Sequence, residues 1–312
     1  MLNSYSPVII PTLNRYEHYK RCVESLERCK GAKNTELYIG LDYPPTKKYK
    51  EGWKKIVKYL EAKQDINGFK SLYILRRKEN LGAVKNIEEL KNFISEKFDR
   101  YIFSEDDNEF SPNFLVYVNE GLARFESNKN IYAICGYNYP IDMCNYENNY
   151  YLSQEFSAWG VGHWVKKDNI VNRVIKREGY LKEFCKLQPI SAFLKDGGRL
   201  LPFIRYINSD YLGDVYITTY IRSNNMYCVF PTVSTVRNWG HDGTGVNCGQ
   251  MDITKCYEGQ NIQDSDSFVF DENVNPHPPL SVRDTLIKFR STKFRTKIKN
   301  LLLLLAYKVQ NR

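Results

Sequence analysis

Apolar runs alternate with helical patterns through the first hundred residues of this 312-residue chain. Four short runs predict buried strands at residues 6–13, 36–45, 70–77 and 100–107. The three segments between them, residues 15–29, 46–63 and 80–98, carry apolar side chains at helical spacing. Strands that alternate with helices in this way predict an α/β fold, with a parallel sheet and helices on its faces.

The second half of the chain is less regular. Residues 130–138, 150–156 and 227–240 favour strands, the last followed by a loop. Residues 171–186 favour one helix, and "WGVGHWV" at 159–165 favours an aromatic turn broken by glycine. No internal repeat accompanies these segments.

The charge of the chain is concentrated at its C-terminal end. The formal net charge is +9, and residues 281–312 hold nine Lys or Arg and one acid, which is +8. The first 280 residues therefore carry only +1, which argues against a nucleic-acid-binding core. An apolar content of 42% is enough for a substantial core.

Cysteine spacing and the N-terminal segment bear on location. None of the eight cysteines has CxxC spacing, which argues against a zinc site. The start "MLNSYSPVIIPTLN" lacks the charged and long apolar parts of a secretory signal. We therefore expect a cytoplasmic protein with reduced cysteines.

Three adjacent carboxylates, Glu105, Asp106 and Asp107, follow the fourth predicted strand. Parallel α/β sheets bind ligands at the carboxyl ends of their strands, and Asp42 and residues 11–15 fall at the same edge. Carboxylates together with substrate phosphates are typical ligands of Mg²⁺ or Mn²⁺. The alternative is a solvated acidic turn beside the N-terminus of the next helix, for which Ser111 is the expected N-cap.

Other nucleotide motifs are missing from the sequence. The chain has no GxxxxGK[ST] phosphate loop, and no GxGxxG opens its first helix. It also lacks GxSxG and HExxH, and "GHDGTG" at 240–245 follows no strand-to-helix turn.

Several segments together resemble the GT-A glycosyltransferases, and within them the N-acetylglucosaminyltransferase I type. "VIIPTLNRYEHYKRCVESL" is similar to that family's first strand and helix, and "SEDDNEFSPNFLVYV" to its Glu-Asp-Asp metal motif. "IGLDYP", "FSAWGVGHW" and residues 211–240 resemble its nucleoside, acceptor and catalytic-base regions more loosely. The resemblance runs through most of residues 5–245.

The resemblance implies a domain organisation and a set of donor-binding residues. It implies a nucleotide-sugar-binding half at 1–135, an acceptor-binding and catalytic half at 136–280, and a separate basic tail at 281–312. Asp107 would hold Mn²⁺ or Mg²⁺. The donor nucleotide-sugar, a UDP-sugar with UDP-N-acetylglucosamine as a candidate, would contact the following residues: Thr12, Asn14, Arg15, Asp42, Glu105 and Asp106.

The resemblance also implies an inverting transfer to a hydroxyl of a glycan acceptor, with Asp214 as general base. "YLGDVY" departs from the family pattern there, which leaves Asp210 as a rival base. His241 is a further candidate metal ligand by analogy, although it is as compatible with an ordinary loop histidine. Trp159 and Trp164 are core aromatics or sugar-stacking side chains, and His18 is expected at the surface.

Two other functions compete with this one. A nucleotidyltransferase acting on sugar phosphates also uses carboxylate-bound Mg²⁺, but it normally has a glycine-rich basic loop after the first strand, which "PTLNRYEHYK" lacks. A non-catalytic, membrane-associated sugar-binding protein is the other alternative, and the complete acid triplet argues against it.

The basic tail predicts a helix over residues 284–307 with an apolar face and a basic flank. Such a helix suits peripheral attachment to the anionic inner face of the membrane, and hence a lipid-linked glycan acceptor in surface polysaccharide synthesis. The alternative is a helix packed on the protein's own core.

Overall fold

The computed structural model describes residues 5–64, 68–143, 146–208, 213–244, 260–272 and 275–311. Its centre is an eight-stranded sheet in the order β3-β2-β1-β4-β8-β6-β9-β7. The strands are β1 (Val8–Thr12), β2 (Glu36–Leu41), β3 (Ser71–Arg76), β4 (Arg100–Phe103), β6 (Ile131–Cys135), β7 (Tyr150–Ser153), β8 (Val161–Trp164) and β9 (Tyr227–Pro231). All neighbours from β3 to β4 are parallel, as are β6 and β9, while β8 and β7 run in the opposite direction. The α/β class is confirmed.

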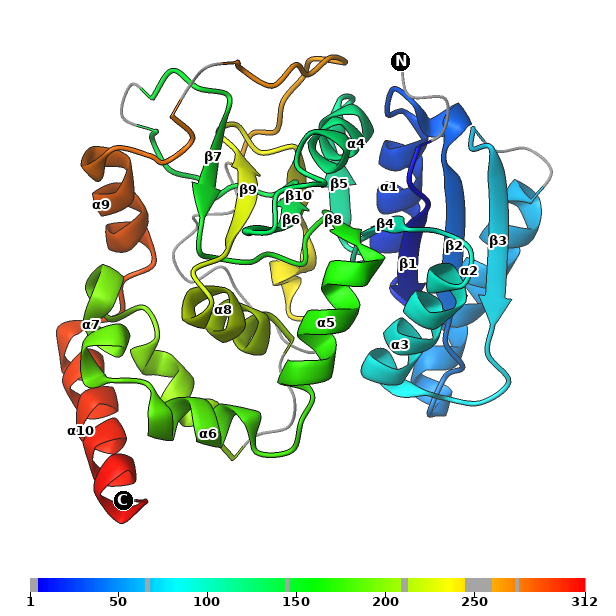
Figure 1. The fold of residues 1–312 in the computed structure, drawn as a ribbon. Coiled ribbons are helices and arrows are strands. Elements are labelled where there is room, and N and C mark those ends of the chain that lie inside the picture. The colour runs from blue at the N-terminus through cyan, green and yellow to red at the C-terminus, as the bar shows by residue number, and fades with distance from the viewer. Residues whose placement is uncertain are drawn as a thin grey trace.

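Helices cover both faces of this sheet and form two hydrophobic cores (Figure 1). One core holds the apolar faces of α1 (Tyr16–Glu27), α2 (Lys50–Lys63) and α4 (Phe114–Arg124). The other holds those of α3 (Gly82–Ser95), α5 (Val165–Ile175), α6 (Tyr180–Leu187), α7 (Ile190–Gly198) and α8 (Gly213–Ser223). The strands alternate between the two: Val8 and Ile10 enter the first core and Ile9 the second, as the period of two in a strand requires.

Short elements complete the connections. The 3-10 turns are η1 (Ala32–Asn34), η2 (Lys47–Tyr49), η3 (Leu201–Tyr206) and η4 (Gly240–Asp242). A second sheet pairs β5 (Asn108–Phe110) with β10 (Val236–Asn238) in antiparallel register. This small sheet follows the acid triplet directly and ties it to a segment more than a hundred residues away.

Three expectations about local structure were wrong. The segment expected as an aromatic turn is the central strand β8, because its small and aromatic side chains fit between β4 and β6. Residues 171–186 fall in two helices: α5 ends at Ile175, and Gly179, in the left-handed conformation at φ 72°, precedes α6 as its N-cap. The N-cap of α4 is Asn113, and Ser111 instead donates its hydroxyl to the Asn113 side chain at 2.7 Å.

A buried polar network joins α5 to the sheet. Asp168 is 2% exposed and accepts hydrogen bonds from the hydroxyls of Tyr101 at 2.6 Å and Tyr132 at 2.7 Å. Lys91 on α3 lies 3.2 Å from the same carboxylate. Although burial alone would raise it, the pKa of Asp168 is lowered by Lys91, the nearby His163 and the two tyrosine hydroxyls.

The C-terminal segment forms two helices, α9 (Leu280–Phe289) and α10 (Phe294–Gln310), instead of one. Both pack on the body, α9 against α7 and α10 against η3 and α6, far from β3 (Figure 1). Val282 and Leu304 are fully buried there. No helix within the described ranges is long and apolar enough to cross a bilayer.

Candidate active site

The carboxyl ends of four parallel strands form the edge at which the acid triplet lies. Thr12, the last residue of β1, pairs with Leu41, the last residue of β2. Phe103 ends β4 beside Ile9, so the acids that follow it lie next to the end of β1. The sequence placed these residues at one edge, and the register brings them together.

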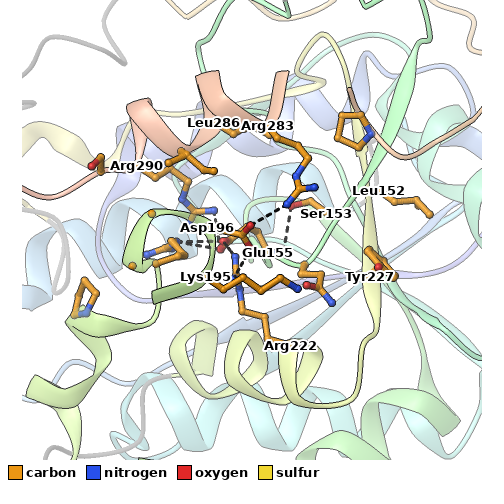
Figure 2. A pocket seen from close by; sticks show the side chains of 18 of the residues that line it. Leu152, Ser153, Glu155, Lys195, Asp196, Arg222, Tyr227, Arg283, Leu286 and Arg290 are labelled. Carbon is orange, nitrogen blue, oxygen red and sulfur yellow. Dashed lines mark hydrogen bonds and ion pairs between the residues drawn. The ribbon is translucent and has the colours of Figure 1, made fainter. Parts of the chain in front are cut away.

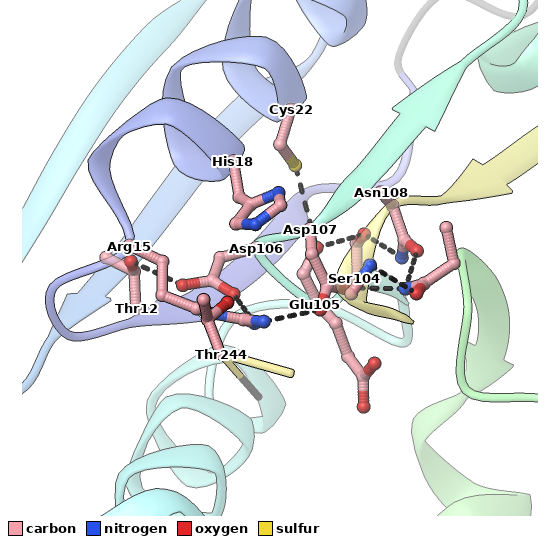
Figure 3. Close-up of polar contacts among 12 residues, drawn as sticks. Thr12, Arg15, His18, Cys22, Ser104, Glu105, Asp106, Asp107, Asn108 and Thr244 are labelled. Atoms are coloured by element: carbon pink, nitrogen blue, oxygen red, sulfur yellow. Dashed lines mark hydrogen bonds and ion pairs between the residues drawn. The ribbon is translucent and has the colours of Figure 1, made fainter. Parts of the chain in front are cut away.

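Thr12 and Arg15 hold the acid pair Asp106 and Asp107 (Figure 3). The Thr12 hydroxyl donates to Asp106 Oδ2 at 2.8 Å. The Arg15 guanidinium bridges the two acids, with one nitrogen hydrogen-bonded to Asp106 and the other 2.8 Å from Asp107 Oδ2. Both acids are nearly buried, at 7% and 5% exposed. The burial rules out the alternative of a fully solvated acidic turn.

Asp107 is also fixed from the side of β10. Asn238 Nδ2 donates to Asp107 Oδ1 at 2.6 Å and to Asn108 Oδ1 at 2.9 Å. The backbone N–H of Trp239 donates to the Asp107 carbonyl at 2.9 Å. Gly240 follows, and a Cβ there would lie only 2.2 Å from Asp107 Oδ2. The carboxylate is thus held in one orientation by both a hydrogen bond and a close backbone approach.

Negative charge at the triplet exceeds what Arg15 can offset. Glu105 is half-buried and extends away from the other two acids (Figure 3). Its pKa is raised to about 8 by burial and by the neighbouring Asp107, Asp214 and Asp106, against the lowering effect of Arg15. Burial also raises the pKa of Asp106, although Arg15 acts in the opposite direction. A further cation would relieve this repulsion.

A second link ties the loop after β10 to α1. Asp242 Oδ2 lies 2.8 Å from His18 Nε2, and its other oxygen accepts both the N–H and the hydroxyl of Thr244. Although burial acts to raise it, these contacts lower the pKa of Asp242 to about 2. The expectation that His18 is a plain surface residue was wrong: its side chain is 14% exposed and fastens the loop beside the acids.

Asp214 lies in the first turn of α8 and is exposed. Its pKa is raised to about 6, mainly because neighbouring protein partly desolvates the carboxylate, while Arg290, a backbone hydrogen bond from Ala158 and Lys91 act to lower it. It is also close enough to Glu105 to raise the pKa of that side chain. A carboxylate that is accessible, has a pKa near neutrality and lies near Glu105 can accept a proton.

In this structure the Asp42 carboxylate is hydrogen-bonded to other groups of the protein. Its buried carboxylate accepts four hydrogen bonds of 2.9–3.0 Å, from the N–H groups of Tyr43, Leu81 and Gly82 and from the Asn80 amide. These contacts fix the start of α3 at the strand edge. A nucleoside contact of Asp42 stays a prediction.

The other predicted residues are placed as follows. Asn14 is half-buried, with its carbonyl packed against Gly52 of α2. His241 packs edge-to-face against Trp159, with ring centroids 5.6 Å apart, so its role as a metal ligand stays a prediction. Trp164 belongs to the core, since it is 4% exposed and donates its Nε1 proton to the Leu122 carbonyl. Asp210 lies outside the described residues.

The carboxylates of the acid triplet suit a divalent cation whose remaining coordination positions are filled by phosphate oxygens of a bound ligand. Within the described ranges, no three His, Cys, Asp or Glu side chains converge into a closed metal cage. One or two carboxylates with excess negative charge around them are nevertheless what Mg²⁺ or Mn²⁺ uses when phosphates supply the rest. Asp107 is the residue best oriented for this role.

Asn238 and His18 were missed from the sequence. Asn238 is 131 positions from Asp107, and a lone asparagine gives no signal of its partner. In the segment around Asn238, the sequence pointed only to His241 and to the glycines of "GHDGTG". The close approach of Gly240 to Asp107 explains why a glycine stands there.

Comparison with known proteins gives matches in structure only. No protein-family model and no curated protein matches the chain. Among solved structures, S. aureus TarS 1-349 matches with 16% identity and a TM-score of 0.36, over 54% of this chain and 49% of that chain. GalNAc-T7 with UDP, GalNAc and Mn²⁺ matches with 11% identity and a TM-score of 0.43, over 75% of this chain and 43% of that chain.

A third match extends over the whole chain. The mannosyltransferase PcManGT from Pyrobaculum calidifontis, in complex with GDP-Man and Mn²⁺, matches with 10% identity and a TM-score of 0.41, over 100% of this chain and 88% of that chain. This chain spans about half of the TarS 1-349 chain, 33% of the chain in a second TarS structure, and 43% of the GalNAc-T7 chain. At such low identity and superposition, the function has to be argued from the chain's own site.

Proposed function

We propose that this protein is a metal-dependent glycosyltransferase that moves a sugar from a nucleotide-diphosphate donor to a hydroxyl of a glycan acceptor. The observation that carries the proposal is the meeting of two carboxylate sites at one sheet edge. Asp106 and Asp107 are fixed by Arg15 and Asn238, and the accessible Asp214 is close enough to Glu105 to raise the pKa of that side chain. The resemblance of the acid motif to the GT-A family supports the same reading, with a UDP-sugar as the donor and UDP-N-acetylglucosamine as the first candidate.

The residues of the site divide the chemistry between them. A divalent cation held by Asp107, with Asp106 and Glu105 beside it, would offset the charge of the leaving diphosphate as a Lewis acid. Arg15 is positioned to bind a phosphate oxygen as well, because its guanidinium is a fork that suits phosphate. Asp42 and α3 shape the nucleoside side of the edge.

Asp214 is proposed as the general base. It takes the proton of the acceptor hydroxyl while that oxygen bonds to the anomeric carbon, and the bond from this carbon to the diphosphate oxygen breaks. Attack from the face opposite the leaving group inverts the anomeric configuration in one step. A product with retained configuration would contradict this mechanism.

The test of the proposal begins with nucleotide binding. Thermal-shift and calorimetric titrations with UDP-, GDP- and dTDP-sugars, with and without Mn²⁺, should give one nucleotide that binds only with the metal. Asp107→Asn should abolish this metal dependence and leave the melting temperature in buffer nearly unchanged. Unchanged metal-dependent binding by the variant would show that the acids serve another purpose.

Turnover separates the competing functions. Slow Mn²⁺-dependent hydrolysis of a nucleotide-sugar indicates a transferase. A nucleotidyltransferase would instead consume a nucleoside triphosphate and a sugar phosphate and release pyrophosphate. A non-catalytic sugar-binding protein would do neither, although it would still bind its ligand.

We also propose that α10 attaches the protein to an anionic inner membrane face, which would suit a lipid-linked acceptor. One side of α10 packs on the body, and the other carries an apolar stripe at helical spacing, exposed between 37% and 76%. The stripe consists of Phe294, Ile298, Leu302, Leu305 and Val309. Lys293, Arg295 and Lys299 are exposed at the N-terminal end of the same helix. Each basic side chain near an anionic surface contributes about 1 kcal/mol, and the leucines can enter the interface.

The structure dictates how this attachment is tested. Because Val282 and Leu304 are buried, removing the tail would damage the fold. Replacing Ile298, Leu302 and Leu305 with Gln removes only exposed apolar groups, and co-sedimentation with anionic vesicles should be lost. The control replaces three equally exposed apolar residues elsewhere with Gln: Val84, Ile170 and Val269. Equal sedimentation of both variants would refute the attachment.

A further inference from the structure

One cavity of the described structure lies away from the acid triplet. It has a volume of about 220 Å³ and opens between the ends of β7 and α7, the start of β9, and α9 (Figure 2). None of the residues that bind or flank the acid triplet lines it. It could hold roughly seven water molecules at about 30 Å³ each, which is room for a small polar group with a substituent.

The lining of this cavity is rich in positive charge. Five cationic side chains line it: Lys195, Arg199, Arg222, Arg283 and Arg290. Two carboxylates, Glu155 and Asp196, oppose them, which leaves an excess of three positive charges (five minus two). Figure 2 shows Glu155, which follows β7, beside Asp196 of α7, Arg222 of α8 and Arg283 of α9.

Each carboxylate is shared among several arginines. Glu155 is contacted by Arg222 at 2.6 Å, by Arg290 at 2.7 Å and by Arg199 Nε at 3.2 and 3.3 Å. Asp196 lies 3.0 Å from both Arg222 and Arg283. Carboxylates that are already shared in this way cannot satisfy all the donors of four guanidinium groups, because each guanidinium carries five.

Two nitrogen donors of the lining have no acceptor among the described residues, Nε of Arg222 and Nζ of Lys195. The Arg222 side chain is only 9% exposed, yet its Nε has no hydrogen-bond acceptor. Lys195 is exposed at the cavity mouth, and its ammonium group makes no ion pair with a described side chain. A buried donor without an acceptor is costly, so a ligand with acceptor oxygens would stabilise this arrangement.

The chemistry of the cavity selects the class of ligand. Planar guanidinium forks bind carboxylates and phosphates, and a neutral sugar would not need them. A phosphate monoester or a diphosphate carries enough negative charge to offset most of the three excess positive charges. A single carboxylate would offset only one of them. At about 220 Å³, the cavity is too small for a stretch of nucleic acid backbone.

A continuous row of aromatic side chains leads from the cavity toward the candidate active site. Arg290 lies 4.5 Å from the Tyr139 ring centroid, and Tyr139 packs on Tyr137 at 5.3 Å. Tyr137 then contacts Trp159 at 4.6 Å, which in turn contacts His241. Arg290 also acts on Asp214, whose pKa it helps to lower against the effect of burial. The cavity is therefore on the side of the proposed general base.

We propose that this cavity binds the phosphate or diphosphate group of a ligand, at a site separate from the acid triplet. Phosphate binding as such does not depend on the proposed function. The assignment of that phosphate to the acceptor, with its sugar lying along the aromatic row, does rest on it. A free phosphate is the other source of the same chemistry.

The test uses the full chain and inorganic pyrophosphate in calorimetric titrations without divalent metal. Wild type should bind one equivalent. Lys195→Gln should weaken binding about tenfold, which is about 1.4 kcal/mol, and Arg222→Lys, which keeps the charge but loses the fork, by at least as much. Lys54→Gln, at an exposed lysine of α2, which packs on α1 far from α7 and α9 (Figure 1), should bind as wild type.

The outcomes distinguish the alternatives. If wild type does not bind, or if both cavity variants bind as wild type, the arginines only fasten α9 to the body and the proposal is wrong. Because Lys195 has no ion pair in the described structure, its variant remains informative even if Arg222→Lys does not fold. Tighter binding of farnesyl diphosphate than of pyrophosphate would identify a lipid-linked source, and equal binding a free phosphate.

Nucleotide binding separates this site from the proposed function. Lys195→Gln should keep the Mn²⁺-dependent nucleotide binding of the wild type. Pyrophosphate binding in the cavity without any metal-dependent nucleotide binding would leave the phosphate site standing and refute the glycosyltransferase. Metal-dependent nucleotide binding without pyrophosphate binding in the cavity would support the glycosyltransferase and refute the phosphate site.

Discussion

Gly240→Ala changes the acid site without removing a charge or a hydrogen-bonding group. Gly240 is not among the glycines with positive φ, so alanine is compatible with its backbone. Its new Cβ would lie 2.2 Å from Asp107 Oδ2, where ordinary contact begins at 3.4 Å. The carboxylate must therefore move by about 1.2 Å (3.4 minus 2.2), away from the position that Asn238 and Arg15 fix.

A displacement of this size sets the expected magnitude. Misplacing a binding group by about 1 Å typically costs about a hundredfold, which corresponds to about 2.7 kcal/mol. The Kd for the nucleotide identified in the metal-dependent screen should rise about a hundredfold in the presence of Mn²⁺. Calorimetry measures this directly, and transfer or hydrolysis should fall by a similar factor.

The control is a crowded glycine far from the acids. A Cβ at Gly121 in α4 would lie 2.9 Å from Ile134 and 3.1 Å from Phe270. Gly121→Ala should lower the melting temperature and leave the metal-dependent Kd unchanged. If Gly240→Ala binds nucleotide and Mn²⁺ as wild type does, the orientation of Asp107 has no role in donor binding and the reasoning fails.

Three further predictions address the base, the core and the arginine cluster. Asp214→Asn should keep donor affinity and reduce kcat about a hundredfold or more. In the wild type kcat/KM should rise with pH through about 6, because the base must be deprotonated, and the variant should lose this rise. If Asp210→Asn shows this pattern instead, the roles of the two residues are exchanged. Asp168→Ala should lower the free energy of unfolding in urea by about 3–5 kcal/mol, because two buried tyrosine hydroxyls and a lysine lose their acceptor, whereas Tyr101→Phe should cost only about 1 kcal/mol. Burial acts to raise the pKa of Glu155, but three arginines hold this pKa at about 2, below its ordinary 4.5. The ionised Glu155 therefore stabilises the fold by about 3 kcal/mol. This contribution is complete above pH 4.5 and is lost as the pH falls toward 2. The difference in unfolding free energy between wild type and Glu155→Gln should shrink across that window, and a difference independent of pH would refute the ion-pair assignment.

The sequence by itself determined the elements of the first half and the edge at which the chemistry lies. The period of two in β1 and β2 and the helical spacing in α1 are local properties, so they are readable without a fold. Glu105, Asp106 and Asp107 follow β4 directly, and a parallel sheet places any such residues at its carboxyl edge. The burial of Asp106 and Asp107 and their contacts with Thr12 and Arg15 agree with that expectation.

Only the tertiary structure decided which distant residues complete these sites. Asn238 meets Asp107 because β10 pairs with β5, and His18 meets Asp242 because the following loop folds back on α1. Strand β8 was mistaken for a turn because a short aromatic and glycine-rich segment gains its extended form from pairing on both sides, which no local pattern encodes. The arginine cluster around Glu155 was invisible for the same reason. Glu155 follows β7, Arg199 follows α7, Arg222 is in α8 and Arg290 follows α9, and only the packing of the chain brings together charges so far apart in sequence.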